Sequence, residues 1–445
     1  MGNKIILFIV FIFVCCIAHS TIAIESSDDI SKTALQRFTR AIAHIKQDYI
    51  KPISDKELVD NAINGMLSNL DPHSDYLVGD SFTKANALLT GEYIGIGFSS
   101  ATINGAVKVI AVTDGSPADK EGLKVGDVIT EINGKSVKDI NADKPTYGPK
   151  GSKITLTILH KNEPKPVTLT LVRDIIKSPP VQWRLLEPNY GYIGIKVFKT
   201  QTSEEVKTAI TSLKKTNKKK LQGVVIDLRG NGGGLQREAV NITNYLLDFD
   251  KLQKNKLITY AKGQNYESQS FASSEDGSLL HNIPIVVLIN EGSASAAELI
   301  AGALQDHKRA IIAGERSLGK GSLQVMFPID MDSKIGLTTA LYYTPLGHSP
   351  QVKGITPDVI INNIEIVDNN QPLGIIGEGA LTNHIKNGNG YNDNIIQRIH
   401  EALQIQKNNE LALARKDYQL YEALHLLKGL NAVNNMQCMA SSTKN

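Results

Sequence analysis

Apolar residues recur at helical spacing in the first part of the chain. The segment from Ser31 to Leu70 is predicted to be helical, with an interruption at Pro52, because proline breaks a helix. The recurring apolar positions are Ile42, Ile45 and Tyr49 before the proline and Leu58, Ala62 and Met66 after it. The sequence Leu70-Asp71-Pro72-His73-Ser74 then marks a turn. We therefore expect an N-terminal helical segment within residues 24–90.

The pattern changes to short strands over residues 91–173. Residues 153–158 alternate strictly between apolar and polar positions, as a half-buried strand does. Asn133-Gly134 is a strong hairpin signal after a β-rich run. These residues are predicted to form a domain of short strands.

Buried strands and helices alternate over residues 174–370. The apolar runs 223–228 and 283–289 are typical of buried strands, and a helix is expected from Ser295 to Gln305. Such alternation indicates a layered sheet. A linker and a second helical segment, predicted from about Asp393 to Leu430, occupy residues 371–445. The predicted fold class is α/β multidomain, with N- and C-terminal helical segments.

The N-terminal residues resemble a secretory signal peptide. Lys4 precedes an unbroken apolar run from Ile5 to Ile17, and Thr21-Ile22-Ala23 follows as a small-x-small cleavage site. We expect residues 1–23 to be removed by cleavage after Ala23. The alternative is a permanent membrane anchor, but the run is shorter than the roughly 20 apolar residues that a span needs.

The composition restricts the cellular compartments and the classes of binding partner that fit this chain. The 445 residues suggest about two to four domains, and the formal net charge of +3 gives no indication of nucleic-acid binding. Two of the three cysteines lie in the predicted signal peptide, which leaves Cys438 without an internal disulfide partner. Export without disulfides fits a bacterial periplasm or cell envelope. No CxxC or HExxH motif is present, so we expect no metal or other cofactor.

A glycine-containing hexapeptide, residues 93–98, is the first candidate binding motif. Its glycines let consecutive backbone N–H groups turn toward one point, which makes a nest for a carboxylate. Further glycine motifs follow at 115–118, 122–127 and 132–134. Together these residues resemble a PDZ domain, a family that captures the C-terminus of a peptide as an added strand. The predicted substrate-binding residues are Ile94, Gly95, Ile96, Gly97 and Phe98. The alternative is a glycine turn in an ordinary β-domain.

A second glycine-rich loop, Asp227–Leu235, follows a predicted buried strand. Its backbone N–H groups could hold an oxyanion or a phosphate. A phosphate loop would normally end in Gly-Lys-Ser/Thr, which this loop lacks. From the motif alone, a plain strand-to-helix turn remains equally open.

Ser295 is the candidate nucleophile. It lies where a strand leads into a helix, and its small neighbours Ala294 and Ala296 leave it accessible. The N–H of Ala296 could donate to an oxyanion beside the helix N-terminus. The sequence is not a GxSxG elbow, because Gly292 precedes Ser295 by three residues. Ser293 is the rival nucleophile, which spacing cannot exclude.

Lys320 is the candidate general base, 25 residues after Ser295. A lysine can take a proton from serine only when it is neutral, and burial lowers its pKa toward that state. If the chain is extended from Lys320 to Met326, then Lys320, Ser322 and Gln324 share one face, and Gln324 could orient the lysine. The alternative is an exposed loop lysine.

Taken together, the motifs resemble the carboxyl-terminal processing (tail-specific) serine peptidases, with a PDZ domain inserted before an α/β peptidase core. The resemblance covers about Leu70 to Leu430. Its motifs are 70–74, the PDZ signature, 227–235, the Ser295 motif, 319–324, 338–345, 354–358 and 419–424. It implies a serine endopeptidase that acts through an acyl-enzyme on protein or peptide substrates with apolar C-termini. The PDZ domain would bind the substrate tail and help to set whether the site is productive.

The resemblance also implies the roles of individual residues. Ser295 would be the nucleophile, Lys320 the general base and Gln324 the assisting residue. The oxyanion donors would be the N–H of Ala296 and that of one loop glycine, for which we choose Gly233. The chain departs from the family pattern at four positions, which are Tyr147, Leu318, Leu341 and His348. Tyr147 stands where many relatives carry an arginine. It is therefore in question whether the PDZ domain is coupled to the active site in this chain.

Other readings stay open at this point. A Ser295–histidine–acid arrangement would need His281, His307 or His348, none of which carries a triad signature. A non-catalytic PDZ adaptor that binds protein C-termini is the alternative from another class. The helical segments Ser31–Leu70 and Asp393–Leu430 carry apolar faces, which we expect to pack together and to mediate a homodimer, or simply to cap the peptidase core.

Overall fold

A computed structural model of the chain describes residues 30–366 apart from short gaps, together with residue 398 and residues 410–442. The gaps are 80, 83–91, 104–105, 114, 138–145, 147, 161–164, 178, 253–255, 265–268, 275–276 and 365. The predicted signal peptide, Tyr147 and the predicted linker lie outside the described residues. The chain divides into two units, residues 1–66 and 67–445, which are described separately.

The first unit contains the predicted helical segment. Helix α1 (Lys32–Asp48) begins after Ser31, whose Oγ accepts a hydrogen bond from the Ala34 N–H at 3.2 Å. Helix α2 (Asp55–Ser68) follows the predicted break at Pro52. No residue of α1 is buried, although it carries large apolar side chains. The exposed members are Leu35, Phe38 and Ile45.

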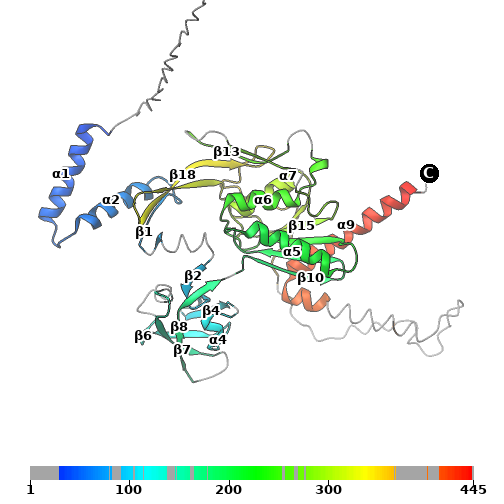
Figure 1. Ribbon diagram of the computed structural model, residues 1–445, viewed down its shortest axis with the longest axis horizontal. Helices are drawn as coiled ribbons and strands as arrows, with labels where there is room; N and C mark the ends of the chain where they lie inside the picture. Colours follow the sequence, from blue (N-terminus) through cyan, green and yellow to red (C-terminus); the bar gives the residue numbers. More distant parts are fainter. Residues whose placement is uncertain are drawn as a thin grey trace, which may run out of the picture. The chain divides into compact units, whose positions relative to one another are not determined.

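The second unit contains a six-stranded sheet (Figure 1). Its order is β10 (Val181–Glu187), β11 (Tyr190–Ile195), β12 (Gly223–Asp227), β15 (Ile285–Ile289), β16 (Ile311–Gly314) and β19 (Val359–Ile360). Only β10 runs antiparallel to its neighbour; the remaining pairs are parallel. Every residue of β12 and β15 is buried, which confirms the two predicted buried strands.

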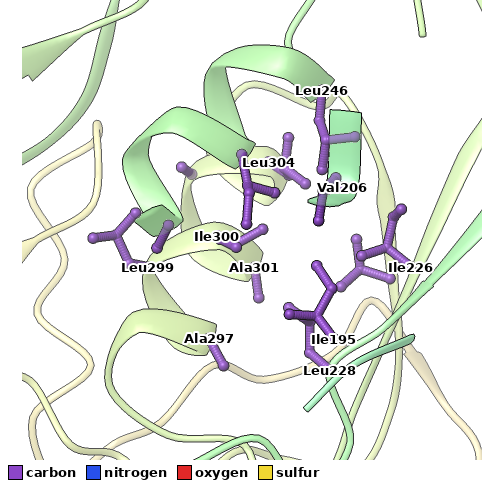
Figure 2. Packing of buried hydrophobic residues seen from close by; sticks show 14 of the residues in the cluster. Ile195, Val206, Ile226, Leu228, Leu246, Ala297, Leu299, Ile300, Ala301 and Leu304 are labelled. Atoms are coloured by element: carbon purple, nitrogen blue, oxygen red, sulfur yellow. The ribbon is translucent and has the colours of Figure 1, made fainter. Parts of the chain in front are cut away.

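Both faces of this sheet are covered. Helices α5 (Thr202–Thr216), α6 (Gln236–Leu246) and α7 (Ala296–Asp306) pack on one face. Figure 2 shows Ala297, Ile300 and Ala301 of α7 in the same apolar cluster as side chains of β11 and β12. Helix α9 (Tyr418–Ser442) covers the other face through Leu420, Ala423, Leu424 and Leu427. This packing fixes α7, and therefore the serine that precedes it, against the sheet.

A second, antiparallel sheet supplies the other side of the site. Its order is β1 (Asp75–Val78), β18 (Ser333–Tyr343), β13 (Leu257–Lys262) and β14 (Gln269–Ala272), and β17 (Ser322–Pro328) also pairs with β18. The register of β17 against β18 shifts between Leu323 and Gln324, so Gln324 lies opposite Thr338. The bulge therefore places one polar side chain beside another.

The β-rich domain has its own sheet and core. The sheet runs β3 (Phe98–Ile103), β4 (Ala106–Val112), β5 (Val128–Ile132), β7 (Lys153–Leu159) and β8 (Val167–Val172), with β6 (Lys135–Ser136) beside β5. Strands β2 (Glu92–Gly95) and β9 (Asp174–Lys177) pair with each other, and α4 (Pro117–Lys120) is a single short helix. Alternate residues of β7 are buried, as predicted. Asn133 and Gly134 both have positive φ and join β5 to β6, which confirms the hairpin.

The C-terminal segment is helical over residues 410–416 and again in α9, which extends past the predicted end at Leu430. Its apolar side chains cap the six-stranded sheet, which was one of the two predicted roles. None of the helices in the described ranges is both long and apolar enough to cross a membrane.

Candidate active site

Ser295 lies at the N-cap of α7 with an unusual backbone conformation. Its φ is 56° and its ψ is −116°, in a region that non-glycine residues rarely adopt. Such a conformation costs about 1–3 kcal/mol and persists only where the surroundings enforce it. Here the buried helix α7 holds the residues that follow. The strain presents the Ser295 side chain at the end of the helix, although the sequence is not a GxSxG elbow.

Gly233 in the glycine-rich loop lies directly against Ser295. A Cβ atom built at Gly233 would lie 2.8 Å from the Cβ of Ser295 and 3.0 Å from the carbonyl oxygen of Ala294. The φ of Gly233 is 108°, which also excludes an ordinary side chain. The loop thus needs glycine here for two independent reasons.

The two candidate serines have different environments. The Oγ of Ser293 donates to the Leu228 carbonyl at 2.8 Å and accepts from the Asn290 N–H at 3.0 Å, and Ser293 is completely buried. Ser295 instead lines a cavity of about 900 Å³. Its access to this cavity favours Ser295 over Ser293 as the nucleophile.

All five predicted catalytic residues line that cavity. They are Ser295, Lys320, Gln324, Gly233 and Ala296. The lining also has a large apolar component, which a peptide side chain could occupy. Its apolar members include Phe198, Leu299, Leu323, Val325 and Met326. Residues that are far apart in the sequence therefore form one site.

Lys320 is half-buried in this cavity. Burial lowers the pKa of Lys320 below that of an ordinary lysine, while the charge of Asp71 opposes part of this shift. Burial and the charge of Lys320 together lower the pKa of His73, which Asp71 partly offsets. The exposed-loop alternative for Lys320 does not hold, and the environment favours the neutral amine that a general base needs.

Glu298 joins the serine segment to the lysine segment. Its Oε2 accepts hydrogen bonds from the backbone N–H groups of Ser295 and Lys320, both at 2.8 Å. Its Oε1 accepts from the Ser317 hydroxyl at 2.6 Å and from the Gly319 N–H at 2.7 Å. Glu298 is fully buried, so these four bonds are what satisfies its carboxylate.

Tyr342 makes a second connection between the same segments. Its hydroxyl lies 2.6 Å from the carbonyl oxygen of Ser295 and 2.9 Å from that of Lys320. Burial and the nearby charge of Glu298 raise the pKa of Tyr342 well above its ordinary value, which keeps the phenol protonated. Tyr342 can therefore act as a donor at any physiological pH.

Gln324 is held by two hydroxyl groups. Its Nε2 donates to the Oγ of Ser322 at 3.0 Å and to the Oγ1 of Thr338 at 3.1 Å. Ser322 and Gln324 thus share one face, as predicted. Lys320 lies before the first residue of β17, yet it lines the same cavity.

The glycine-rich loop is anchored by two polar side chains. Asn231 donates from Nδ2 to the Ile195 carbonyl at 2.9 Å and accepts the Gly233 N–H at Oδ1, also at 2.9 Å. Arg229 makes paired hydrogen bonds to Asp227 and to Asp417, close to α9. The role of the Gly233 N–H as an oxyanion donor stays a prediction, and Asn231 Oδ1 competes for that proton.

Two of the three histidines considered for a triad have other partners. The Nε2 of His307 is 2.7 Å from the Leu257 carbonyl, and the Nδ1 of His281 is 3.5 Å from carboxylate oxygens of Asp248 and Asp250. No histidine is among the described residues that line the cavity. This arrangement disfavours a serine–histidine–acid site.

The predicted carboxylate nest spans the end of β2 and the start of β3. Ile94 is partly exposed, whereas Ile96 is buried in the core of the β-rich domain. Gly97 has a φ of 85°, and a Cβ atom there would lie 2.2 Å from the Cβ of Ser116. Gly95 is buried and Phe98 packs partly against the same core. The five residues are contiguous in space, and their contact with a peptide stays a prediction.

Several residues of the site were not assigned a role from the sequence. Glu298 was visible only as part of the serine motif, and Asp71 and His73 only as part of a turn. Thr338 and Tyr342 lie in the motif 338–345, for which the family resemblance implied no role. Their contacts with Lys320, Gln324 and one another across the site join residues distant in the sequence, so spacing could not reveal them.

Comparisons with known proteins identify the domains along the chain. Residues 189–361 match peptidase family S41, residues 93–171 match the PDZ domain, and residues 17–81 match the N-terminal domain of the activating protease CtpB. A crystal structure of an S41 protease from Bacteroides fragilis NCTC 9343 has 18% identity and a TM-score of 0.50, covering 71% of this chain and 84% of that one. That likeness concerns the fold.

Two relatives extend the match over most of the chain. The carboxy-terminal-processing protease of Bartonella bacilliformis is 35% identical over 443 residues, which cover 96% of each chain. The carboxy-terminal processing protease CtpA of Bacillus subtilis is 33% identical over 345 residues, covering 77% of this chain and 72% of the relative. The chain therefore belongs to peptidase family S41 and is a serine-type protease of the carboxy-terminal-processing group with a PDZ domain.

Proposed function

We propose that the protein is an exported endopeptidase that cleaves through a Ser295–Lys320 acyl-enzyme mechanism. The observation that carries the proposal is the shared cavity, which brings Ser295, Lys320 and Gln324 together with Ala296 and the glycine-rich loop. The lowered pKa of Lys320 supports its role as base.

The reaction begins when neutral Lys320 takes the proton of the Ser295 hydroxyl. The Ser295 oxygen attacks a peptide carbonyl, and the tetrahedral oxyanion accepts hydrogen bonds from the Ala296 N–H and a loop N–H, with Gly233 as our choice. Lys320 then returns the proton to the leaving amine. Water, deprotonated by Lys320, hydrolyses the acyl-enzyme and frees Ser295.

The proposed substrates are proteins and peptides with apolar C-termini. The residues Ile94–Phe98 would accept the terminal carboxylate and align the tail as an added strand. The apolar lining of the catalytic cavity suits side chains near the scissile bond. Export to a bacterial periplasm or cell envelope is supported by the apolar run and cleavage site before residue 24.

We also propose that a second copy of the chain covers the apolar face of α1. Leu35, Phe38 and Ile45 of that helix are exposed. Burial of such side chains is a common source of homodimer affinity. Light scattering at micromolar concentration should give the mass of a dimer for the mature chain and of a monomer for Phe38→Glu. A monomeric wild-type protein would exclude this part of the proposal.

Cleavage of a peptide that ends in apolar residues tests the enzymatic proposal. The purified mature protein should cleave it, whereas Ser295→Ala and Lys320→Ala should not. Cleavage that survives either change would overturn the Ser–Lys assignment. Single replacements of His281, His307 and His348 should retain activity, and loss in any one of them would favour a histidine base.

The same assay separates the proposal from its main alternative. A non-catalytic PDZ adaptor would bind the peptide without cleaving it. The tail preference is tested with an amidated peptide of the same sequence, which lacks the carboxylate and should be a poorer substrate. Equal cleavage of both peptides would remove the carboxylate nest from the proposal.

A further inference from the structure

The turn Leu70–Ser74 lies beside the lysine side of the active site. The Asp71 carboxylate accepts four hydrogen bonds, three of them from within the turn. These come from the His73 N–H at 2.8 Å, the Ser74 N–H at 3.0 Å and the Ser74 hydroxyl at 2.6 Å. The fourth comes from the Oγ1 of Thr338, on strand β18, at 3.0 Å. The turn is thereby attached to the strand that faces Gln324.

Asp71 is ionised in this setting. Burial alone would raise the pKa of Asp71, but the hydrogen bonds from Ser74, His73 and Thr338 outweigh burial and hold the pKa below its ordinary value. An ionised carboxylate has no proton and can only accept hydrogen bonds. The contact between Asp71 and Thr338 therefore has one direction, with the Thr338 hydroxyl as donor.

That direction determines how Gln324 is oriented. A hydroxyl has a single proton, so the Oγ1 of Thr338 must be an acceptor toward Gln324 once its proton points to Asp71. The group of Gln324 that lies 3.1 Å away must then be the NH₂, which also lies 3.0 Å from the Oγ of Ser322. The amide oxygen Oε1 is left without a hydrogen bond within the described part of the chain.

The free amide oxygen suits the chemistry of the lysine. Gln324 and Lys320 line the same cavity. Lys320 becomes a cation when it takes the proton of Ser295, and an amide oxygen stabilises that cation whereas an NH₂ group would repel it. The orientation of one amide thus decides whether Gln324 assists or opposes proton transfer.

We propose that Asp71 is a positioning residue that acts through Thr338 to direct the amide oxygen of Gln324 toward the lysine side of the cavity. This inference rests on the proposed Ser–Lys function and extends it to a residue outside the peptidase sheet. The alternative is that Asp71 acts on Lys320 through its charge alone.

The two roles of Asp71 predict opposite effects. As a charge, Asp71 raises the pKa of Lys320, so its loss would leave more neutral lysine and increase activity at neutral pH. As a positioning residue, its loss frees Thr338 to reverse its hydrogen bond, which lowers kcat. The other groups that face this region are His73, Glu298 and Tyr342, and they stay unchanged in the variants below.

The experiment compares the pH dependence of kcat and KM for Asp71→Asn, Thr338→Val and Thr338→Ser. Thr338→Val removes the hydroxyl that links Asp71 to Gln324 but keeps the Asp71 charge. We therefore expect kcat to fall about 10- to 100-fold with little change in KM, and the rise of kcat with pH to stay at the same pH. Thr338→Ser keeps the hydroxyl and should restore most of the activity. Asp71→Asn should lower the alkaline plateau of kcat and move the rise of kcat with pH to lower pH.

Thr339→Val is the matched control. It removes the neighbouring hydroxyl, which is buried without a hydrogen-bond partner among the described residues, and it should retain wild-type activity. Wild-type kcat in Thr338→Val, or an alkaline plateau of kcat in Asp71→Asn that is equal to or above that of the wild type, would overturn the inference. Because Thr338→Ser keeps the hydroxyl that Thr338→Val lacks, equal activity of these two variants would overturn it as well. Inactive wild-type protein, or active Ser295→Ala, would instead overturn the proposed function.

Discussion

The Tyr342 hydroxyl lies within hydrogen-bond distance of the backbone carbonyls of both Ser295 and Lys320, at 2.6 and 2.9 Å. One buried phenol thus sets the spacing between the strained serine and the loop that carries the lysine. The contacts involve backbone atoms, so they position both residues without occupying their reactive side chains.

Removal of this hydroxyl should impair catalysis more than stability. Tyr342→Phe should cost about 1 kcal/mol of unfolding free energy, the usual contribution of one hydrogen bond. We expect kcat to fall about tenfold, because small displacements of reacting groups are costly. Steady-state kinetics and thermal unfolding measure the two effects. Tyr343→Phe, one residue further along β18, is the control, and equal activity of the two variants would contradict the assigned role.

Loss of the Glu298 charge should disrupt the site as a whole. Glu298→Gln replaces one of two acceptor oxygens with an NH₂ group that faces backbone donors. Leaving buried donors unsatisfied costs about 1–3 kcal/mol. We expect reduced stability in chemical denaturation and at least a tenfold loss of kcat/KM. Glu291→Gln is an exposed control in the same motif and should behave as wild type.

The activity should rise with pH through the titration of Lys320. Burial lowers the pKa of this lysine, so the neutral base becomes populated below the pH at which an ordinary lysine titrates. The same shift disfavours the folded state at neutral pH, and this cost is relieved as pH rises toward the ordinary lysine value. A profile of kcat/KM against pH checks the sign. Activity that falls as pH rises above neutrality would contradict a lysine base.

A side chain at position 233 should not be accommodated. Gly233→Ala places a Cβ atom 2.8 Å from Ser295 at a φ of 108°, so we expect a marked loss of activity and reduced stability. Gly429→Ala is the contrasting control, because a Cβ atom there meets nothing within 4 Å and alanine favours a helix by about 1 kcal/mol. Gly233→Ala should lower both activity and melting temperature, whereas Gly429→Ala should keep wild-type activity and raise the melting temperature.

Much of the fold follows from local patterns in the sequence. The alternation at 153–158, the apolar runs at 223–228 and 283–289 and the Asn133-Gly134 turn each predict an element that the structure confirms. These signals are local, because strand periodicity and turn conformation depend on a few neighbouring residues. The end of α9 was misplaced by 12 residues, since the sequence after Leu430 has no strong helix-stop signal.

The site was predictable only in part. Ser295, Lys320 and Gln324 were found through their motifs, and the structure brings them to one cavity. The positive φ of Ser295 was not predictable, because it results from tertiary packing around α7. Asp71 and Thr338 are 267 residues apart in the sequence, so nothing local connects them. The predicted homodimer and the signal peptide stay predictions.

The ion pairs of Arg229 have a consequence for the order in which the enzyme matures. Arg229 holds the start of the glycine-rich loop, and its partner Asp417 lies 188 residues further along the chain. A ribosome makes Asp417 after every catalytic residue has already emerged or entered the exit tunnel. The loop beside Ser295 therefore acquires its full set of anchors only after Asp417 has been made.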